Sequence, residues 1–162
     1  MEMPWEEKAG TILWSYYAGM ESGTALAGIL TGRINPSGKL AETFPRVYED
    51  TPTGHNGQFG RDDMVCYEEE IMVGYRHYEK NDILPMFCFG HGLSYTEFAY
   101  HDLQVKQDND AKDRVSISFD IENVGQIDGR EIVQIYVRDE ECTVIRPEKE
   151  LKAFKSLSLI HI

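Results

Sequence analysis

Three adjacent residues, Glu68, Glu69 and Glu70, carry side chains that could do acid–base chemistry. Mutual repulsion between neighbouring carboxylates can raise the pKa of one of them, and a general acid needs such a raised pKa near neutral pH. Adjacent acids on a loop are more often solvated, and a helix dipole accounts for Glu21 in the first turn of a predicted helix. We therefore expect no catalytic role for this cluster or for Glu21.

Other kinds of reactive site are missing from the sequence. The three cysteines, Cys66, Cys88 and Cys142, form no C-x-x-C pair, have no histidine at zinc-site spacing, and are too few for a disulfide framework. We expect buried, inert thiols and a reducing, cytoplasmic compartment, although a longer parent could be exported. The chain also has no P-loop, no G-x-G-x-x-G after a strand and no supported Ser-His-Asp arrangement, so we predict neither a metal nor a cofactor.

The charge of the chain restricts its partners. Its 162 residues include 28 acidic and 16 basic side chains, and the resulting net charge of −12 would repel phosphates. No stretch reaches the roughly 18 uncharged apolar residues that a membrane span requires. We therefore expect no nucleic-acid partner and no membrane partner.

The first part of the chain predicts one strand and one helix. Residues 11–17, T-I-L-W-S-Y-Y, form an apolar and aromatic run between glycine-containing segments, which is typical of a buried strand. In residues 20–30 apolar side chains recur at helical spacing, and Gly32 can end this helix in a left-handed conformation. One strand–helix unit cannot cover both faces of a parallel sheet, so residues 1–45 are expected to be the tail of a larger α/β domain.

The middle of the chain has no sustained period. Residues 46–63 are rich in Asp, Gly, Pro, Thr and Asn and predict a long loop. Residues 46–92 as a whole are interpreted as loop and interdomain linker. His91 lies between two glycines, and we expect a turn residue with a structural hydrogen bond rather than a ligand or a base.

Residues 93–162 have the pattern of β-structure. Residues 115–121 alternate strictly between apolar and polar side chains, as a half-buried strand does, and a glycine-bounded turn follows at 125–129. Further strands are predicted at 98–105, 132–137 and 150–157. These short strands indicate a β-sandwich, of which about four strands out of roughly seven can be counted. Because the last residues stop in mid-strand, we expect a truncated sandwich.

Three groups of residues resemble a family signature. They are N-P-S-G-K-L-A-E-T-F-P at residues 35–45, the run from Y-E-E-E-I-M-V-G-Y-R to F-C-F-G-H-G-L-S-Y-T at residues 67–96, and P-E-K-E-L-K-A-F at residues 147–154. Together they resemble the C-terminal part of a glycoside hydrolase family 3 enzyme of the β-glucosidase type. The resemblance implies an α+β fragment in two parts, the end of a flavodoxin-like α/β sandwich followed by a fibronectin type III-like β-sandwich.

The chain departs from the family pattern at three positions. Glu70 stands at the glycine of Y-x-E-G-I-x-V-G-Y-R, Cys88 at the proline of F-P-F-G, and Ala153 at the glycine of K-E-L-K-G-F. If the family glycine reflects a positive φ, Glu70 is strained or the loop differs locally. These departures concern loop geometry and leave the resemblance intact.

The resemblance implies a parent enzyme that hydrolyses terminal β-linked sugars. Retaining hydrolysis needs two carboxyl groups about 5–5.5 Å apart. In family 3 the nucleophile is an aspartate followed by tryptophan, the acid/base lies upstream of the part resembled here, and this chain has no Asp-Trp dipeptide. We therefore predict no catalytic residue in the chain, which would support the remaining catalytic domains of the parent and meet the β-glycoside substrate only through them.

Four residues match the family motif and are our candidates for substrate binding: Tyr67, Glu69, Tyr75 and Arg76. Aromatic faces stack on sugars, and guanidinium groups donate hydrogen bonds to hydroxyls. The alternative is structural, with the tyrosines packed beneath the linker and Arg76 paired to Glu69 or Asp82. A different class of function also stays open, a stand-alone, non-catalytic β-sandwich module that binds carbohydrate or a protein partner.

Overall fold

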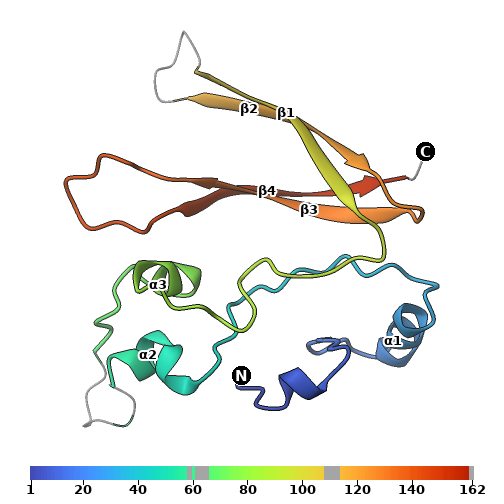
Figure 1. Ribbon diagram of the computed structural model, residues 1–162, viewed down its shortest axis with the longest axis horizontal. Coiled ribbons are helices and arrows are strands. Elements are labelled where there is room, and N and C mark those ends of the chain that lie inside the picture. The colour runs from blue at the N-terminus through green and yellow to red at the C-terminus, as the bar shows by residue number, and fades with distance from the viewer. Residues whose placement is uncertain (58–59, 61–65, 108–113, 161–162) are drawn as a thin grey trace. The chain divides into compact units, whose positions relative to one another are not determined.

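The computed structural model describes residues 1–57, 60, 66–107 and 114–160 (Figure 1). Helices precede strands along the chain, in keeping with a mixed fold. The elements in order are η1 (Glu6–Lys8), α1 (Ser22–Leu30), η2 (Tyr48–Asp50), α2 (Pro52–His55), α3 (Tyr75–Lys80), β1 (Phe98–Gln107), β2 (Val115–Asn123), β3 (Gly129–Val137) and β4 (Glu150–Leu159).

The chain divides into two compact units, each assembled from separate stretches of sequence. The first unit contains Met1–Tyr17, Gly38–Gly92 and Val133–Lys155. The second contains Ala18–Ser37, Leu93–Ile132 and Ser156–Ile162. Helices α2 and α3 belong to the first unit, whereas α1 and the hairpin of β1 and β2 belong to the second. Each unit is described by itself below.

Helix α1 confirms the helix predicted for residues 20–30. It ends where Gly32 adopts a φ of 73°, a left-handed conformation that glycine reaches without a steric penalty. The Tyr95 hydroxyl donates to the carbonyl of Ile29 at 2.9 Å and so satisfies one of the carbonyls that a helix end leaves free. Within the helix itself only Gly28 is buried.

The strand predicted at residues 11–17 is wrong. The segment has no strand structure, and its Tyr17 side chain is fully exposed, at 102%. The Trp14 ring instead packs edge-on against Phe44, with 5.4 Å between ring centroids. A strand is held by hydrogen bonds to a neighbouring strand, and in the described part of the chain no sheet contains a partner for this segment.

The segment predicted as a long loop contains two short helical elements, η2 and α2. Thr51 caps α2, because its Oγ1 accepts a hydrogen bond from the Gly54 N–H at 3.0 Å. Pro52 follows at the start of the helix, where a missing N–H breaks no helical hydrogen bond. The Thr-Pro pair was the available signal, but a single helical turn leaves no periodic pattern in a sequence.

The four predicted strands are confirmed, and Figure 1 shows them as two pairs. β1 and β2 form one two-stranded antiparallel sheet, and β3 and β4 form another. In the first sheet Phe98 lies opposite Asn123, and the register is interrupted between His101 and Gln104. Asp102, inside that interruption, has a φ of 53°. The sheets are consistent with part of a fibronectin type III-like domain.

Few large apolar side chains are buried in the described residues. The buried hydrophobic ones are Met3, Phe44, Tyr78 and Val133, all in the first unit. By contrast, Met20 is 97% exposed and Leu30 is 70% exposed. The described chain therefore presents apolar surface that its own elements leave uncovered.

Candidate functional site

Helix α3 carries two of the four predicted binding residues, Tyr75 and Arg76, in its first turn. Gly74 precedes the helix with a φ of 56°, a conformation that is strained for a residue with a Cβ. This conformation explains the glycine of the V-G-Y-R motif. The next two residues, His77 and Tyr78, are only 3% and 4% exposed, so the helix is anchored in the first unit by its middle.

Tyr75 lies among aromatic rings. Its ring stacks on Phe89 with 5.4 Å between centroids and meets Tyr136 edge-on at 5.6 Å. Its hydroxyl oxygen accepts a hydrogen bond from the Leu151 N–H at 2.9 Å. The ring and the hydroxyl are therefore both fixed by residues far away in the sequence.

Arg76 pairs with a different partner from the expected one. Its Nη2 lies 3.5 Å from a carboxylate oxygen of Glu150, and its Nη1 donates to the Ile71 carbonyl at 3.4 Å. The predicted pairing with Glu69 or Asp82 is therefore wrong. The beginning of β4 approaches the first turn of α3 and brings Glu150 to the guanidinium, which no local sequence pattern could indicate.

A cavity of about 390 Å³ opens beside this turn, and we call it the Tyr75 cavity. Tyr75 and Phe89 give it aromatic surface, Arg76 gives it a guanidinium, and Glu42 and Thr43 give it a carboxylate and a hydroxyl. This mixture suits a neutral polyhydroxy ligand, because rings stack on its C–H faces while charged groups bond its hydroxyls. Glu42 is the one carboxylate in the lining, so the cavity lacks the carboxyl pair of a glycoside hydrolase.

The other two predicted binding residues, Tyr67 and Glu69, do not line the Tyr75 cavity. Tyr67 is 79% exposed, and Glu69 is half-buried in the turn that follows it, where its carbonyl accepts the Met72 N–H at 2.8 Å. The structure thus brings Tyr75 and Arg76 together in one cavity and leaves Tyr67 and Glu69 outside it. A binding role for these two stays a prediction.

Glu70 has the backbone conformation that its place at the glycine of the family motif indicated. Its φ is 50°, in the left-handed region where glycine is favoured. The Glu70 N–H donates to the Tyr67 carbonyl at 3.2 Å, so the strained residue closes a turn. The side chains of Glu68 and Glu70 are exposed, which agrees with the solvated interpretation of the acidic cluster.

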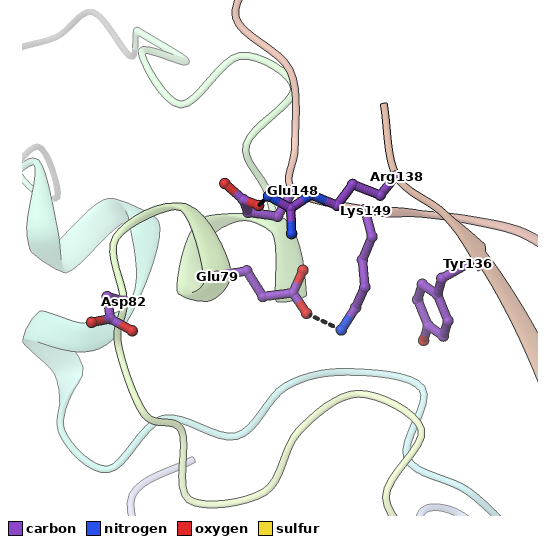
Figure 2. Close-up of a pocket in the computed structure, with 6 residues that line it drawn as sticks. All are labelled: Glu79, Asp82, Tyr136, Arg138, Glu148 and Lys149. Atoms are coloured by element: carbon purple, nitrogen blue, oxygen red, sulfur yellow. Dashed lines mark ion pairs between the residues drawn. The ribbon is translucent and has the colours of Figure 1, made fainter. Parts of the chain in front are cut away.

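A second cavity, of about 400 Å³, is lined by Glu79 of α3, Tyr136 of β3 and Lys149 beside the start of β4, and we call it the Lys149 cavity (Figure 2). Figure 2 shows Glu79 reaching from α3 toward Lys149, with 2.7 Å between the two charged atoms. Lys149 Nζ also lies 5.3 Å from the centre of the Tyr136 ring. Burial, with smaller electrostatic contributions from Tyr75 and Glu79, raises the pKa of Tyr136 and keeps its hydroxyl protonated. The sequence did not indicate this cavity, although Lys149 belongs to the P-E-K-E-L motif.

His77 is held in one neutral tautomer. Its Nε2 lies 3.1 Å from the Asp50 carbonyl, and the Asn81 amide nitrogen lies 3.1 Å from its Nδ1. The carbonyl requires a proton on Nε2, and the amide, as a donor, requires a bare Nδ1. Burial lowers the pKa of His77 below 6.5, with a smaller contribution from His55 in the same direction. Tyr78 beside it has a pKa raised to about 12 by burial.

His91 is a turn residue, as predicted. Its N–H donates to the Cys88 carbonyl at 3.0 Å, its carbonyl accepts from the Leu40 N–H at 2.8 Å, and its ring stacks on Phe87 at 5.3 Å. The predicted burial of the cysteines is wrong, because all three thiols, none of which is in a disulfide, are exposed. They lie in connecting segments, which run over the surface and bury little.

The described residues contain neither a cluster of metal ligands nor a membrane-spanning helix. Among them, no group of three or more His, Cys, Asp and Glu side chains has the arrangement of a metal site. Within the same residues, no helix has the length and apolar character needed to cross a membrane.

The class of protein follows from comparison with known families. Residues 1–95 match the glycosyl hydrolase family 3 C-terminal domain, and residues 131–160 match the fibronectin type III-like domain. The first match covers more than half of the chain, so the chain belongs to glycosyl hydrolase family 3 and corresponds to its C-terminal region. The resemblance drawn from the motifs is confirmed.

Individual relatives agree with this assignment. The chain is 48% identical to thermostable β-glucosidase B of Acetivibrio thermocellus over 160 residues, which are 98% of this chain and 21% of that protein. It is 40% identical to β-glucosidase BoGH3A of Bacteroides ovatus, over 99% of this chain and 22% of that protein. The chain therefore spans about a fifth of the length of these curated relatives.

Solved structures give the same result. β-Glucosidase 3B from Thermotoga neapolitana in complex with glucose matches with a TM-score of 0.89 at 41% identity, over 98% of this chain and 22% of that one. A family 3 β-glucosidase from Bifidobacterium adolescentis matches with a TM-score of 0.90 at 36% identity, over 97% and 23%. The fold of the chain is therefore that of the corresponding region of these enzymes.

Proposed function

We propose that this chain is part of a β-glucosidase that hydrolyses terminal β-linked sugars, and that it supports the active site without supplying catalytic carboxylates. The observation that carries the proposal is its likeness to β-glucosidases along almost its whole length, at 48% identity to one of them. One solved relative is a complex with glucose, which supports a sugar as the ligand. The catalytic carboxyl pair would lie in the four-fifths of the parent that this chain does not match.

The chain's own contribution to sugar binding would come from the Tyr75 cavity. Its rings, its guanidinium and its single carboxylate suit a neutral sugar and provide no pair for bond cleavage. Tyr67 and Glu69 would contact the sugar or the rest of the parent from the exposed turn before α3. The net charge of −12 is compatible with an uncharged substrate and supports the absence of nucleic-acid and membrane partners.

The finer architecture is part of the same proposal. Residues 1–45 would be the tail of a flavodoxin-like α/β sandwich whose remaining elements the parent supplies. Residues 46–92 would link it to the fibronectin type III-like domain over residues 93–162. A cytoplasmic setting is supported by the sparse, unpaired cysteines.

The test compares the full-length parent with the isolated chain on an aryl β-glucoside, with the aryl α-glucoside as control substrate. We expect the parent to hydrolyse the β-anomer alone, and the isolated chain to release nothing above buffer, because the chemistry requires the missing carboxyl pair. A parent without β-glucosidase activity would refute the proposal and favour a stand-alone binding module. Turnover by the isolated chain that disappears on Glu69→Gln or Glu70→Gln would refute the non-catalytic role.

A further inference from the structure

We propose that Lys149, Glu150 and Leu151, where β4 begins, are positioning residues that hold Tyr75 and Arg76 in the wall of the Tyr75 cavity and thereby set its affinity for a sugar. The inference rests on the proposed function and deepens it. It also accounts for two motifs together, because P-E-K-E-L and V-G-Y-R come from distant parts of the sequence and meet here. We call the three residues the β4 clamp.

Each residue of the β4 clamp contacts α3 through a different atom. The Leu151 N–H donates to the Tyr75 hydroxyl oxygen at 2.9 Å. The Glu150 carboxylate lies 3.5 Å from the Arg76 guanidinium. The Lys149 ammonium lies 2.7 Å from the Glu79 carboxylate, and Figure 2 draws this ion pair. Three consecutive residues therefore contact both the first turn and the last turn of α3.

The β4 clamp matters because α3 is too short to hold its own position. A helix of six residues is below the length at which a helix is stable alone, so tertiary contacts fix its place. The opposite side of α3 is fixed by His77, which bonds the Asp50 carbonyl at 3.1 Å and is 3% exposed. The tilt of α3 between these two sides decides where the Tyr75 ring and the Arg76 guanidinium lie in the cavity wall.

The Arg76 guanidinium is only partly engaged by this arrangement. Its Nε is buried without a hydrogen-bond partner, and the side chains of Arg76 and Glu150 are 29% and 31% exposed. Glu150 therefore orients the guanidinium without using all of its donors. The remaining donors can serve sugar hydroxyls only while the group stays in this orientation.

The Lys149 cavity contains a matched ion pair outside the β4 clamp. Arg138 and Glu148 lie 3.3 Å apart, with side chains 65% and 52% exposed, and they flank β3 and β4 rather than α3. Lys149 and Glu79 are less exposed, at 46% and 29%, and they join β4 to α3. Reversing one charge in either pair turns an attraction into a repulsion, but only the reversal at Lys149 pushes α3 away.

The experiment measures KM and kcat of the full-length parent on an aryl β-glucoside for three variants. We expect Lys149→Glu to raise KM about fivefold with kcat retained, the change that about 1 kcal/mol of lost binding produces. The charge-swapped variant, Lys149→Glu with Glu79→Lys, should restore KM because attraction returns with reversed sign. Glu148→Lys, the control, should leave KM unchanged.

Several results would overturn the inference. One is an unchanged KM in Lys149→Glu, including the case where only the thermal midpoint falls, since that describes a merely structural contact. Another is an equal rise in Glu148→Lys, or a swapped variant that folds and keeps the high KM. If Lys149→Glu does not fold, Lys149→Met, which removes the attraction without adding repulsion, decides in its place. An inactive unmodified parent would refute the proposed function itself, and this inference with it.

Discussion

Helices α1 and α3 contrast in what holds them. α1 has nine residues, apolar side chains at helical spacing and a glycine at its end, yet of its residues only Gly28 is buried. α3 has six residues and no sequence period, yet it buries His77 and Tyr78 and is attached to β4 at its first and last turns. Helical pattern and tertiary fixation are therefore separate properties in this chain.

The difference between α1 and α3 indicates where a ligand-binding role is expected. α1 is formed by local signals and its Leu30 side chain is 70% exposed, so we expect no ligand-binding role for it. α3 depends on contacts from distant segments, and those contacts place Tyr75 and Arg76 in a cavity. Changes at α3 should therefore affect local stability and ligand binding together, whereas changes at exposed positions of α1 should affect neither within this chain.

The largest expected effect separates the two helices directly. Tyr78→Ala should lower the local stability of α3 by about 3 kcal/mol, because it empties the space of a buried aromatic side chain. Leu30→Ala, at a 70% exposed position of α1, should change stability by less than about 0.5 kcal/mol. Hydrogen exchange of the helix amides in the isolated chain, to which the 70% exposure of Leu30 refers, measures both. Equal losses of local stability in α1 and α3 would show that the two helices do not differ in tertiary fixation.

A smaller effect concerns the two left-handed residues beside the helices. Glu70→Gly should stabilise the turn before α3 by about 1 kcal/mol, because glycine reaches a positive φ without the steric cost that glutamate bears. Gly32→Glu, the matched reverse change after α1, should destabilise by a similar amount. The shift of thermal midpoint in the parent, in opposite directions for the two variants, is the measurement. A Glu70→Gly variant that is less stable than the unmodified parent would contradict the inference that Glu70 is strained.

The smallest effect is a pH dependence specific to α3. The pKa of His77 is lowered in the folded state and is near 6.5 in the unfolded state. The stabilisation that the neutral His77 ring gives to the folded state is therefore complete above pH 6.5 and is lost as the pH falls through the folded pKa. Asp50 and Glu69 oppose this shift, and His55 adds to it. Amide exchange in α3, corrected for the intrinsic rate, should show the loss, and His77→Gln should remove it. His101→Gln, at an exposed histidine, is the control, and a pH dependence that survives in His77→Gln would contradict the assignment.

Local patterns in the sequence predicted a good part of this structure. The helix α1, the left-handed Gly32, the four strands and the turn at His91 all follow from periodicity or turn chemistry. The positive φ of Glu70 followed from its place in the family motif. In each case the interactions that decide the structure join residues close together in the sequence, or the family motif indicates the conformation.

The parts that could not be predicted depend on distant segments. α3 forms because β4 and residues near Asp50 fix it, and Arg76 pairs with Glu150 although Glu69 and Asp82 are closer in sequence. The apolar run at residues 11–17 predicted a buried strand, but none of its residues is buried, because burial also requires a covering element. The exposed cysteines show the same limit, since residue type alone does not say which segment reaches the surface.

We propose that this chain is a supporting part of a larger enzyme, and the stability of the isolated chain tests this proposal most directly. Tyr17 and Met20 are 102% and 97% exposed, and such apolar surface should bind a hydrophobic dye and promote association. We expect the isolated 162-residue chain to bind the dye and unfold over a broad range, and the full-length parent to unfold sharply without binding it. An isolated chain that is monomeric, binds no dye and unfolds in one sharp transition would contradict the claim and favour the stand-alone module.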